Sequence, residues 1–317
     1  MNKRVAVIGA GVAGITAASI LQENGVSVTV FEKSRGVGGR MATRKSRTGY
    51  EFDHGAPFFT VHSPSFLNTT QTGNWANHVG VWDVNDPDKQ VPYFVGEPMM
   101  KSPIEALAAK LKISLNARIT KIHRTNGKWG LTIEHNDHKD IYDMVVVAAP
   151  AFQVHQLTRF SKRLTGQLSQ VNMTPCWALL VSVNTPAHHR GPVFVPKTGP
   201  ISFIARNSSK AGRDSKRDVW VAHASPAWSQ TNLELDPEDA ISHLHPVLNS
   251  IIGSSEANPP YISAHRWRYA NVAQAAGTPF LKDETASLFA AGDWCLGPGV
   301  EHAFASGEAV AQSILST

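Results

Sequence analysis

Three glycines near the N-terminus have the spacing of sites that bind the pyrophosphate of a dinucleotide. Gly9, Gly11 and Gly14 follow the apolar residues 5–8 and precede a segment of helical character. The first glycine permits a tight turn, the second lets the backbone approach the phosphates, and the third allows the helix to pack on the strand. Free N–H groups at the helix N-terminus attract the phosphates. We therefore predict a dinucleotide site that includes Gly9, Gly11, Val12, Ala13 and Gly14.

An acidic residue follows these glycines at a suitable distance. Residues 26–31 indicate a second strand, which ends at Glu32. A carboxylate about 20 residues beyond the glycines meets a ribose diol in such sites. The succession of strand, turn, helix, strand and acid favours this interpretation over a glycine-rich turn without a ligand. Lys33, next to Glu32, is included in the predicted site.

Two later segments add further candidate residues, of which the first suits an anionic ligand. In residues 38–41, adjacent glycines let the backbone lie against a ligand while the Arg40 guanidinium reaches an anion. The alternative is a surface loop with a solvated arginine, which the position directly after Glu32 disfavours. Near the C-terminus, a strand over 287–293 ends in Gly-Asp, and a helix follows to about residue 315. We therefore predict that Gly39, Arg40 and Met41 bind the cofactor, and the family resemblance described below implies the same for Gly292 and Asp293.

The elements that must position these groups follow from the pattern of apolar residues. Helices are predicted over 15–24, 104–111 and 236–252. Residues 61–95 are predicted to be loop with a short helix. Strands are predicted over 115–124, 128–135, 139–147, 177–183, 193–195, 201–205, 219–223 and 261–270. Because residues 144–147 are apolar on both faces, we expect that strand in a buried parallel sheet.

The composition of the chain excludes several classes of function. The chain has 317 residues, a formal net charge of +5 and two cysteines. Its basic residues are too dispersed for a nucleic-acid surface, and two cysteines do not make a disulfide framework. No stretch approaches about 18 uninterrupted apolar residues, so we expect no membrane span. The N-terminal apolar stretch belongs to the glycine motif and not to a signal peptide, which predicts a cytoplasmic protein.

Four motifs in chain order resemble the bacterial renalase-like proteins, a branch of the flavin amine-oxidase superfamily. They are SRGVGGRMATR at 34–44, FDHGAPFFT at 52–60, HRWRYA at 265–270 and AGDWCLG at 291–297. The resemblance implies noncovalent FAD and an enzyme that oxidises dihydronicotinamide isomers of NAD(P)H to NAD(P)+. Hydride would pass to flavin N5, and oxygen would be reduced to hydrogen peroxide. The expected partners are thus a dihydronicotinamide dinucleotide and oxygen; the oligomeric state is not predicted.

The resemblance also implies the fold class and the domains. It is an α/β protein with a Rossmann-like FAD-binding domain, a parallel sheet and a β-meander crossover. A mostly antiparallel α+β substrate domain is inserted into it. The FAD-binding domain would comprise residues 1–62, 96–152 and 284–317, and the substrate domain residues 63–95 and 153–283.

Roles for individual residues follow from the same resemblance. Glu32 would bind the adenosine ribose, and the Gly-Gly-Arg segment the pyrophosphate. Ile119 would lie at the adenine, and Asp293 at the ribityl or pyrophosphate portion. The flavin would lie over His54, Gly55 and Ala56 and near the helix start at Val300 and Glu301. A helix N-terminus there would stabilise negative charge on the reduced flavin.

The substrate pocket is predicted from alternation along the strand at 261–270. His265, Trp267 and Tyr269 share one face, which we expect to line the pocket, and Arg266 and Arg268 share the other. In the alternative, the aromatic residues are core and the arginines are solvated. A further alternative has Arg268 pair with a substrate phosphate.

Several alternatives remain open at this point. The same fold would suit an amine or amino-acid oxidase, or a flavin-binding redox sensor without turnover. His54 is more typical of a structural hydrogen-bonding residue than of a base. Cys295 near the flavin favours a small buried thiol over a covalent thioether. No metal is predicted, because His188, His189, His243 and His245 lack companions at ligand spacing.

Overall fold

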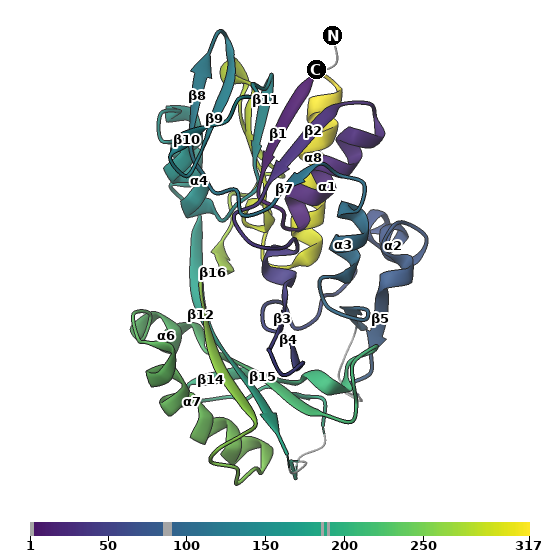
Figure 1. Ribbon diagram of the computed structural model, residues 1–317, viewed down its shortest axis with the longest axis vertical. Coiled ribbons are helices and arrows are strands. Elements are labelled where there is room, and N and C mark those ends of the chain that lie inside the picture. Colours follow the sequence, from purple (N-terminus) through teal and green to yellow (C-terminus); the bar gives the residue numbers. More distant parts are fainter. Residues whose placement is uncertain (1–2, 85–90, 185–186, 189–190) are drawn as a thin grey trace.

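The computed structural model describes residues 3–84, 91–184, 187–188 and 191–317, with two large sheets in its two halves (Figure 1). The upper sheet has the strand order β17-β18-β11-β1-β2-β7. Its neighbouring strands pair in parallel, apart from the antiparallel edge strand β17. The strands are β1 Arg4–Ile8, β2 Ser27–Phe31, β7 Ile113–Ser114, β11 Met144–Val147, β17 Leu281–Asp283 and β18 Leu288–Ala290.

Both faces of the upper sheet are covered, which explains why its strands are apolar throughout. Because side chains alternate along a strand, Val5 and Val7 point to one face and Ala6 and Ile8 to the other. The first face packs against helices α1 Val12–Glu23, α3 Ser102–Ala108 and α8 Val300–Leu315. The second packs against strands β8 Ile119–Thr125 and β9 Lys128–Ile133 and helices α4 Ala151–Thr158 and α5 Lys162–Leu168, and the exposed strand β10 Asn136–Asp137 pairs with β9.

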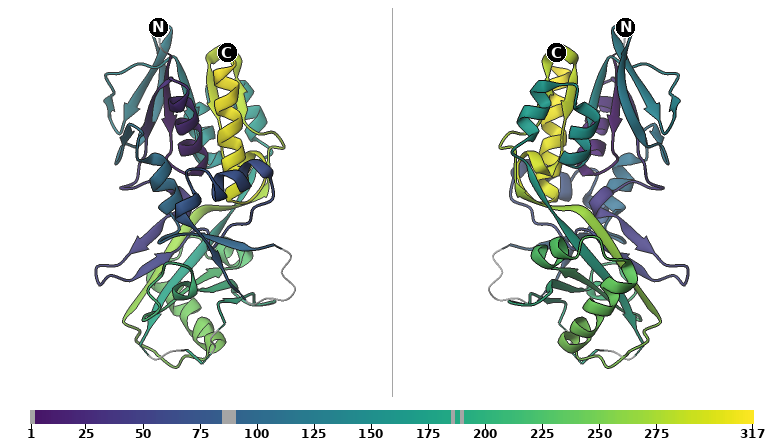
Figure 2. Two further views of the ribbon diagram at one scale, coloured as in Figure 1. Left: turned by 90° about the vertical axis from the view of Figure 1, so that its right-hand side faces the viewer. Right: turned by 90° about the vertical axis from the view of Figure 1, so that its left-hand side faces the viewer.

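The lower sheet is antiparallel, with the order β13-β14-β15-β12-β16. Its strands are β12 Asn172–Val183, β13 Val193–Phe194, β14 Ile201–Arg206, β15 Asp218–Ala224 and β16 Tyr261–Gln274. Helices α6 Pro226–Thr231 and α7 Pro237–Ile252 bury one face, where Leu179 and Trp220 pack against Leu244 and Leu248. Figure 2 shows these green helices in the lower half and the yellow helix α8 in the upper half.

The remaining elements are smaller. They are the hairpins β3 Thr43–Lys45 with β4 Glu51–Asp53 and β5 Val79–Trp82 with β6 Tyr93–Gly96, the helix α2 Pro64–Gln71, and the 3-10 turns η1 Gly39–Met41, η2 Ala76–His78, η3 Asn207–Ser209, η4 Glu284–Ala286 and η5 Asp293–Cys295. Helix α2 packs on α8, with the rings of Phe66 and Phe304 5.0 Å apart. Among the described residues, no helix combines the length and apolarity needed to cross a membrane.

The structure confirms the α/β class, the parallel sheet and the antiparallel arrangement of the second sheet, but it corrects several boundaries. Helix α1 begins at Val12 and not at residue 15, because Gly11 already caps it in an extended conformation. The strand predicted over 115–124 begins only at Ile119, as β8, and β7 precedes the predicted range; Asn116 between them has a positive φ of 52°, which interrupts the extended chain. The strand predicted over 139–147 is confined to 144–147, and β10 uses residues 136–137, which lie between two of the predicted strands.

Other differences concern segments with weak periodicity. The helix predicted over 104–111 is α3, which begins and ends earlier. Helices α4, α5 and α6 and the hairpin of β5 and β6 were not predicted. These elements are short, and tertiary packing stabilises them more than their own sequence pattern does.

Candidate functional site

One continuous cleft of about 2760 Å³ is lined by segments of both halves of the molecule. Among the predicted site residues, Gly14 is the one that does not line it. The cleft walls include Gly9, Gly11, Val12, Ala13, Glu32, Lys33, Gly39, Arg40, Met41, His54, Gly55, Ala56, Ile119, His265, Trp267, Tyr269, Gly292, Asp293, Val300 and Glu301. Residues distant in sequence are therefore brought to one surface.

The three N-terminal glycines have different environments. A Cβ added at Gly14 would overlap the carbonyl oxygen of Gly9, so Gly14 allows α1 to pack on the turn. Gly9 has a positive φ of 110°, which favours glycine. A Cβ at Gly11 would meet no atom within 4 Å, although Gly11 lines the cleft. The open space beside Gly11, at the N-terminus of α1, fits a phosphate group.

Glu32 is buried at the end of β2, with both carboxylate oxygens engaged. Oε2 accepts a hydrogen bond from the N–H of Ala10 at 2.8 Å, and Oε1 accepts one from the N–H of Ser34 at 2.8 Å. A carboxylate oxygen has two lone pairs, so each can accept a second hydrogen bond. The backbone thus holds the carboxylate in a fixed position in the cleft wall.

Arg40 and Asp293 form a bidentate ion pair. Nη1 and Nη2 of Arg40 lie 2.7 and 2.6 Å from the carboxylate oxygens of Asp293. Nη1 also donates to the carbonyl of Ala270 in β16, at 3.0 Å. The pair therefore joins the segment after β2, the C-terminal segment and the lower sheet at one point of the cleft.

The segment after β4 lies directly against Arg40. The N–H of Ala56 donates to the carbonyl of Arg40 at 2.7 Å, and a Cβ at Gly55 would overlap the same carbonyl. The neighbouring ring of His54 is 7% exposed. Glycine is therefore required at position 55 for this close approach.

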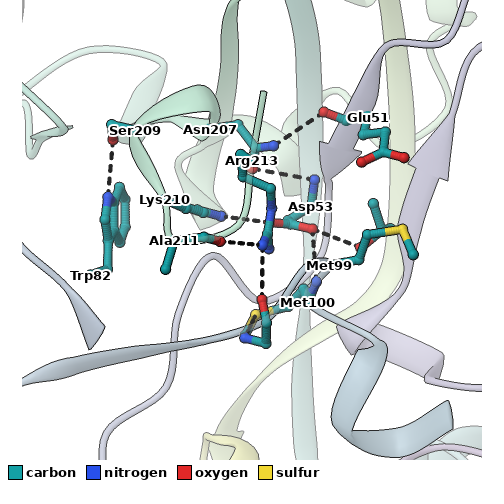
Figure 3. Close-up of polar contacts among 12 residues, drawn as sticks. Glu51, Asp53, Trp82, Met99, Met100, Asn207, Ser209, Lys210, Ala211 and Arg213 are labelled. Atoms are coloured by element: carbon teal, nitrogen blue, oxygen red, sulfur yellow. Dashed lines mark hydrogen bonds and ion pairs between the residues drawn. The ribbon is translucent and has the colours of Figure 1, made fainter. Parts of the chain in front are cut away.

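Asp53, the residue before His54, belongs to a buried ion cluster outside the cleft lining (Figure 3). Its carboxylate lies 3.1 Å from Nζ of Lys210 and 2.6 Å from Nη2 of Arg213, and it accepts a hydrogen bond from Thr43. Burial alone would raise the pKa of Asp53, but the two cations hold it well below its usual range. Burial lowers the pKa of Lys210 to about 8. The cluster fixes the end of β4, from which His54 extends.

The face of the lower sheet opposite α6 and α7 forms the other wall. Ala178 of β12 is paired in register with His223 of β15 and His265 of β16. The ring of His265 lies 4.8 Å from that of His54 and 4.5 Å from that of Trp267, between ring centroids. Three histidines therefore meet near one small side chain.

All three histidines are held neutral. Burial lowers the pKa of His54 to about 3 and the pKa values of His223 and His265 to about 4. Arg44 further lowers the pKa of His54 and His265, and Lys210 that of His223. Within the described residues, Nδ1 of His54 and Nε2 of His223 are buried without a hydrogen bond of good geometry, although the backbone carbonyls of Ala42 and His54 lie near enough to raise the pKa values of the two rings. These nitrogens are polar atoms that a ligand can satisfy.

The carboxylates of the cleft already have partners. The acidic residues in its described lining are Glu32, Asp293 and Glu301. Glu301 accepts hydrogen bonds from the N–H groups of His62 and Ser63 at 2.9 and 2.6 Å. A cationic ligand would therefore have to compete with existing contacts for a carboxylate.

Cys176, His223, Tyr261 and Arg44 also line the cleft, and sequence reasoning missed them. His223 was seen only as the end of a predicted strand. The alternation along residues 219–223 could have placed it on the same face as Val221, but not opposite His265. That relation depends on the register of three strands that are distant in sequence.

The two faces of β16 that the predicted alternation distinguishes have different contacts. Tyr269 lines the cleft and stacks on Phe152, with ring centroids 5.2 Å apart. Arg268 forms a bidentate ion pair with the exposed Glu234, at 2.7 Å, and Arg266 also pairs with that carboxylate. Arg268 is thus already bound to an acid, which disfavours it as a phosphate partner.

The cysteines and the other histidines have simpler environments. Cys295 is buried outside the cleft lining, and burial raises its pKa to about 12, which favours the interpretation as a packed thiol. In the described part of the chain, no group of His, Cys, Asp and Glu side chains has an arrangement that could hold a metal ion. His189 lies outside the described residues.

Two family models match the chain. The model of the flavin-containing amine oxidoreductases matches residues 76–315, and that of the NAD(P)-binding Rossmann-like domain matches residues 7–69. Among solved structures, a protein from Exiguobacterium described as a protoporphyrinogen oxidase superposes with a TM-score of 0.77 at 15% identity, covering 100% of both chains. The cyclohexylamine oxidase of Brevibacterium oxydans has a TM-score of 0.74 at 12% identity, covering 100% of this chain and 99% of that one.

Curated relatives match over shorter segments. The chain is 28% identical over 159 residues to a 4-hydroxybenzoate brominase (decarboxylating) of Pseudoalteromonas luteoviolacea, covering 50% of this chain and 28% of that protein. It is 52% identical over 59 residues to the lysine-specific histone demethylase 1 homolog 3 of Arabidopsis thaliana, covering 19% of this chain and 4% of that protein. The chain thus spans only a small part of the length of these relatives.

Proposed function

Because the chain belongs to the family of flavin-containing amine oxidoreductases, which are FAD-dependent, we propose that it oxidises dihydronicotinamide isomers of NAD(P)H. The substrate, one proton and one molecule of oxygen would give NAD(P)+ and hydrogen peroxide. This is the activity of the renalase-like proteins that the four sequence motifs resemble. The substrate ring becomes aromatic when it loses hydride, so its oxidation requires no general base.

The residues of the cleft suit FAD. The space beside Gly11 and the N-terminus of α1 would take the pyrophosphate, and Glu32 the adenosine ribose. His54, Gly55 and Ala56 would lie along the flavin, and the start of α8 would supply N–H groups to it. The bound cofactor supplies two-electron redox chemistry, while the chain supplies orientation and electrostatics.

The weak basicity of the cleft histidines carries this proposal. Alkylamines are protonated near pH 7 and must lose a proton before they can donate hydride, so a side chain that accepts a proton at that pH would favour their oxidation. Burial holds the pKa of His54, His223 and His265 at about 3 to 4, far from that range. A dihydronicotinamide ring is neutral and donates hydride directly, so it fits these neutral side chains better.

An amine oxidase is the second candidate, because Trp267 and Tyr269 give the cleft the aromatic lining that suits a neutral amine. To distinguish the two, the oxidised FAD-loaded protein is mixed anaerobically with borohydride-reduced NAD+ and, separately, with a panel of amines and amino acids. We expect the visible flavin absorbance to bleach rapidly only with the reduced dinucleotide mixture, and peroxide to form when air is admitted. Bleaching by amines alone would overturn the proposal, and bleaching by neither would favour a flavin-binding protein without turnover.

A further inference from the structure

Arg44 is a half-buried cation in the cleft, and the described part of the chain provides no counter-ion for it. It belongs to β3 and lines the cleft. Within the described residues, its guanidinium has neither a hydrogen-bond acceptor nor a carboxylate at ion-pair distance. Withdrawing a charge from water without a partner is costly, so such an arrangement favours a ligand that carries the opposite charge.

The register of the hairpin places Arg44 on the side of the lower sheet. Arg44 is paired across the hairpin with Phe52, and cross-strand partners share a face. Phe52 stacks on Tyr261 of β16, with ring centroids 5.0 Å apart. The adjacent pair, Thr43 and Asp53, points to the opposite face and joins the buried ion cluster. Arg44 therefore extends toward the wall that carries the histidines.

One observation places the guanidinium near these histidines, and a second distinguishes it from other cations of the cleft. Its charge lowers the pKa of both His54 and His265. Several other cations in the cleft lining are already paired with acids: Arg40 with Asp293, Lys45 with Glu51, Lys101 with Glu105, and Arg266 and Arg268 with Glu234. Arg44 combines partial burial, a position near the histidines and a free charge.

We propose that Arg44 binds a phosphate group of the substrate while the substrate ring lies beside His54 and His265. This inference rests on the proposed function, and it adds a specificity-determining residue to it. In a nicotinamide dinucleotide, a ribose separates the ring from the nearest phosphate, and a guanidinium binds phosphate through two parallel hydrogen bonds. The phosphate does not change during the reaction, so Arg44 would stabilise the bound substrate and the transition state equally.

The test compares a substrate that contains phosphate with one that does not. One is borohydride-reduced NAD+, and the other is borohydride-reduced N-methylnicotinamide, which has the same ring without phosphate. For the FAD-loaded Arg44→Gln variant, we expect the KM of the dinucleotide to rise about 10- to 100-fold, as for a lost charged hydrogen bond. Its kcat should stay within about twofold, and the KM of the phosphate-free substrate should also change less than about twofold. Arg44→Lys should recover part of the loss.

Arg217→Gln is the matched control. Arg217 contacts the same hairpin, 3.3 Å from the carbonyl of Thr48 and 4.7 Å from the centroid of the Tyr50 ring, but it does not line the cleft. The Arg217→Gln substitution removes the same charge and should leave the KM values of both substrates unchanged. An equal rise of KM for both substrates in Arg44→Gln would show a structural role and overturn the proposal, as would no change for either.

A binding measurement separates this inference from the proposed function. The product NAD+ is titrated into the FAD-loaded protein, and its Kd is compared with that of N-methylnicotinamide by calorimetry. If the wild-type protein oxidises neither reduced substrate, the proposed function fails, but a selective loss of NAD+ affinity in Arg44→Gln would still support the phosphate site. Equal NAD+ affinity in both proteins, or no NAD+ binding to either, would overturn it.

Discussion

The indole N–H of Trp267 donates a hydrogen bond of 2.8 Å to the backbone carbonyl of His54. This bond joins β16 of the lower sheet to the segment that lies against Arg40. It thereby sets the distance between the two walls of the cleft at the histidines. Trp267 also lines the cleft, so one side chain contributes both a surface and a structural contact.

Trp267→Phe should therefore affect both stability and cofactor binding. The variant leaves the carbonyl of His54 without a donor, which we expect to lower the free energy of unfolding by about 1 to 3 kcal/mol. The loosened segment should also weaken FAD binding severalfold. Trp129→Phe is the control, since the Trp129 indole N–H donates to the carbonyl of Ala286 at 2.9 Å, outside the cleft. Urea unfolding and FAD titration check both variants, and an equal loss of FAD affinity in the control would contradict a specific role for Trp267.

Alanine at Gly11 and at Gly14 should have opposite consequences. A Cβ at Gly14 would overlap the Gly9 carbonyl oxygen, so Gly14→Ala should destabilise the fold by several kcal/mol, with or without FAD. A Cβ at Gly11 meets no protein atom within 4 Å and would project into the cleft. Gly11→Ala should therefore fold normally and lose FAD affinity. Thermal unfolding of the FAD-free proteins and FAD titration measure the two effects; unchanged FAD affinity in Gly11→Ala would argue against a phosphate at that position.

The neutral histidines predict an acid-sensitive stability. Their pKa values of about 3 to 4 in the folded protein lie below the ordinary value of 6.5, so the unfolded chain binds more protons between those limits. Their contribution to stability is complete above about pH 6.5 and is lost as the pH falls toward 4. We expect the Tm to decrease between pH 6.5 and 5, before most carboxylates titrate, and the decrease to be smaller in His223→Gln. The same slope in the variant would contradict this assignment.

The buried ion cluster predicts an asymmetry between its acid and its bases. Asp53→Asn leaves Lys210 and Arg213 buried without their counter-ion and should cost about 3 to 5 kcal/mol of stability. Lys210→Met keeps the contact of Arg213 with Asp53 and replaces a buried ammonium by an apolar group, so its cost should be below about 2 kcal/mol. Urea unfolding at pH 7 measures both, and the reverse order would show that Lys210 is the essential partner.

The N-terminal part of the site could be predicted from the sequence because its spacing is local. Gly9, Gly11 and Glu32 belong to one strand, turn, helix and strand unit, in which sequence distance fixes spatial distance. The alternation along β16 likewise follows from backbone geometry. Such relations are visible in a single sequence.

The lower wall could not be predicted, because it depends on pairing between distant strands. His223 and His265 flank Ala178 only through the register of both strands with β12. Arg44 has no counter-ion among the described residues, because its hairpin turns Lys45 and not Arg44 toward Glu51. The partners of Asp53 lie 157 and 160 residues away, so no local pattern indicates that cluster.

The contact between α1 and α8 has a consequence for how the protein acquires its cofactor. A Cβ at Gly307 of α8 would overlap the carbonyl oxygen of Ala13, which lines the cleft, so α1 and α8 touch at the cleft wall. Contacts of such long sequence separation form late, because the loop-closure entropy must be overcome first. During synthesis, the N-terminal half of the site emerges long before α8 and stays incomplete. We therefore expect FAD to bind only after α8 has been synthesised. Until then, the incomplete site of the growing chain remains exposed to solvent.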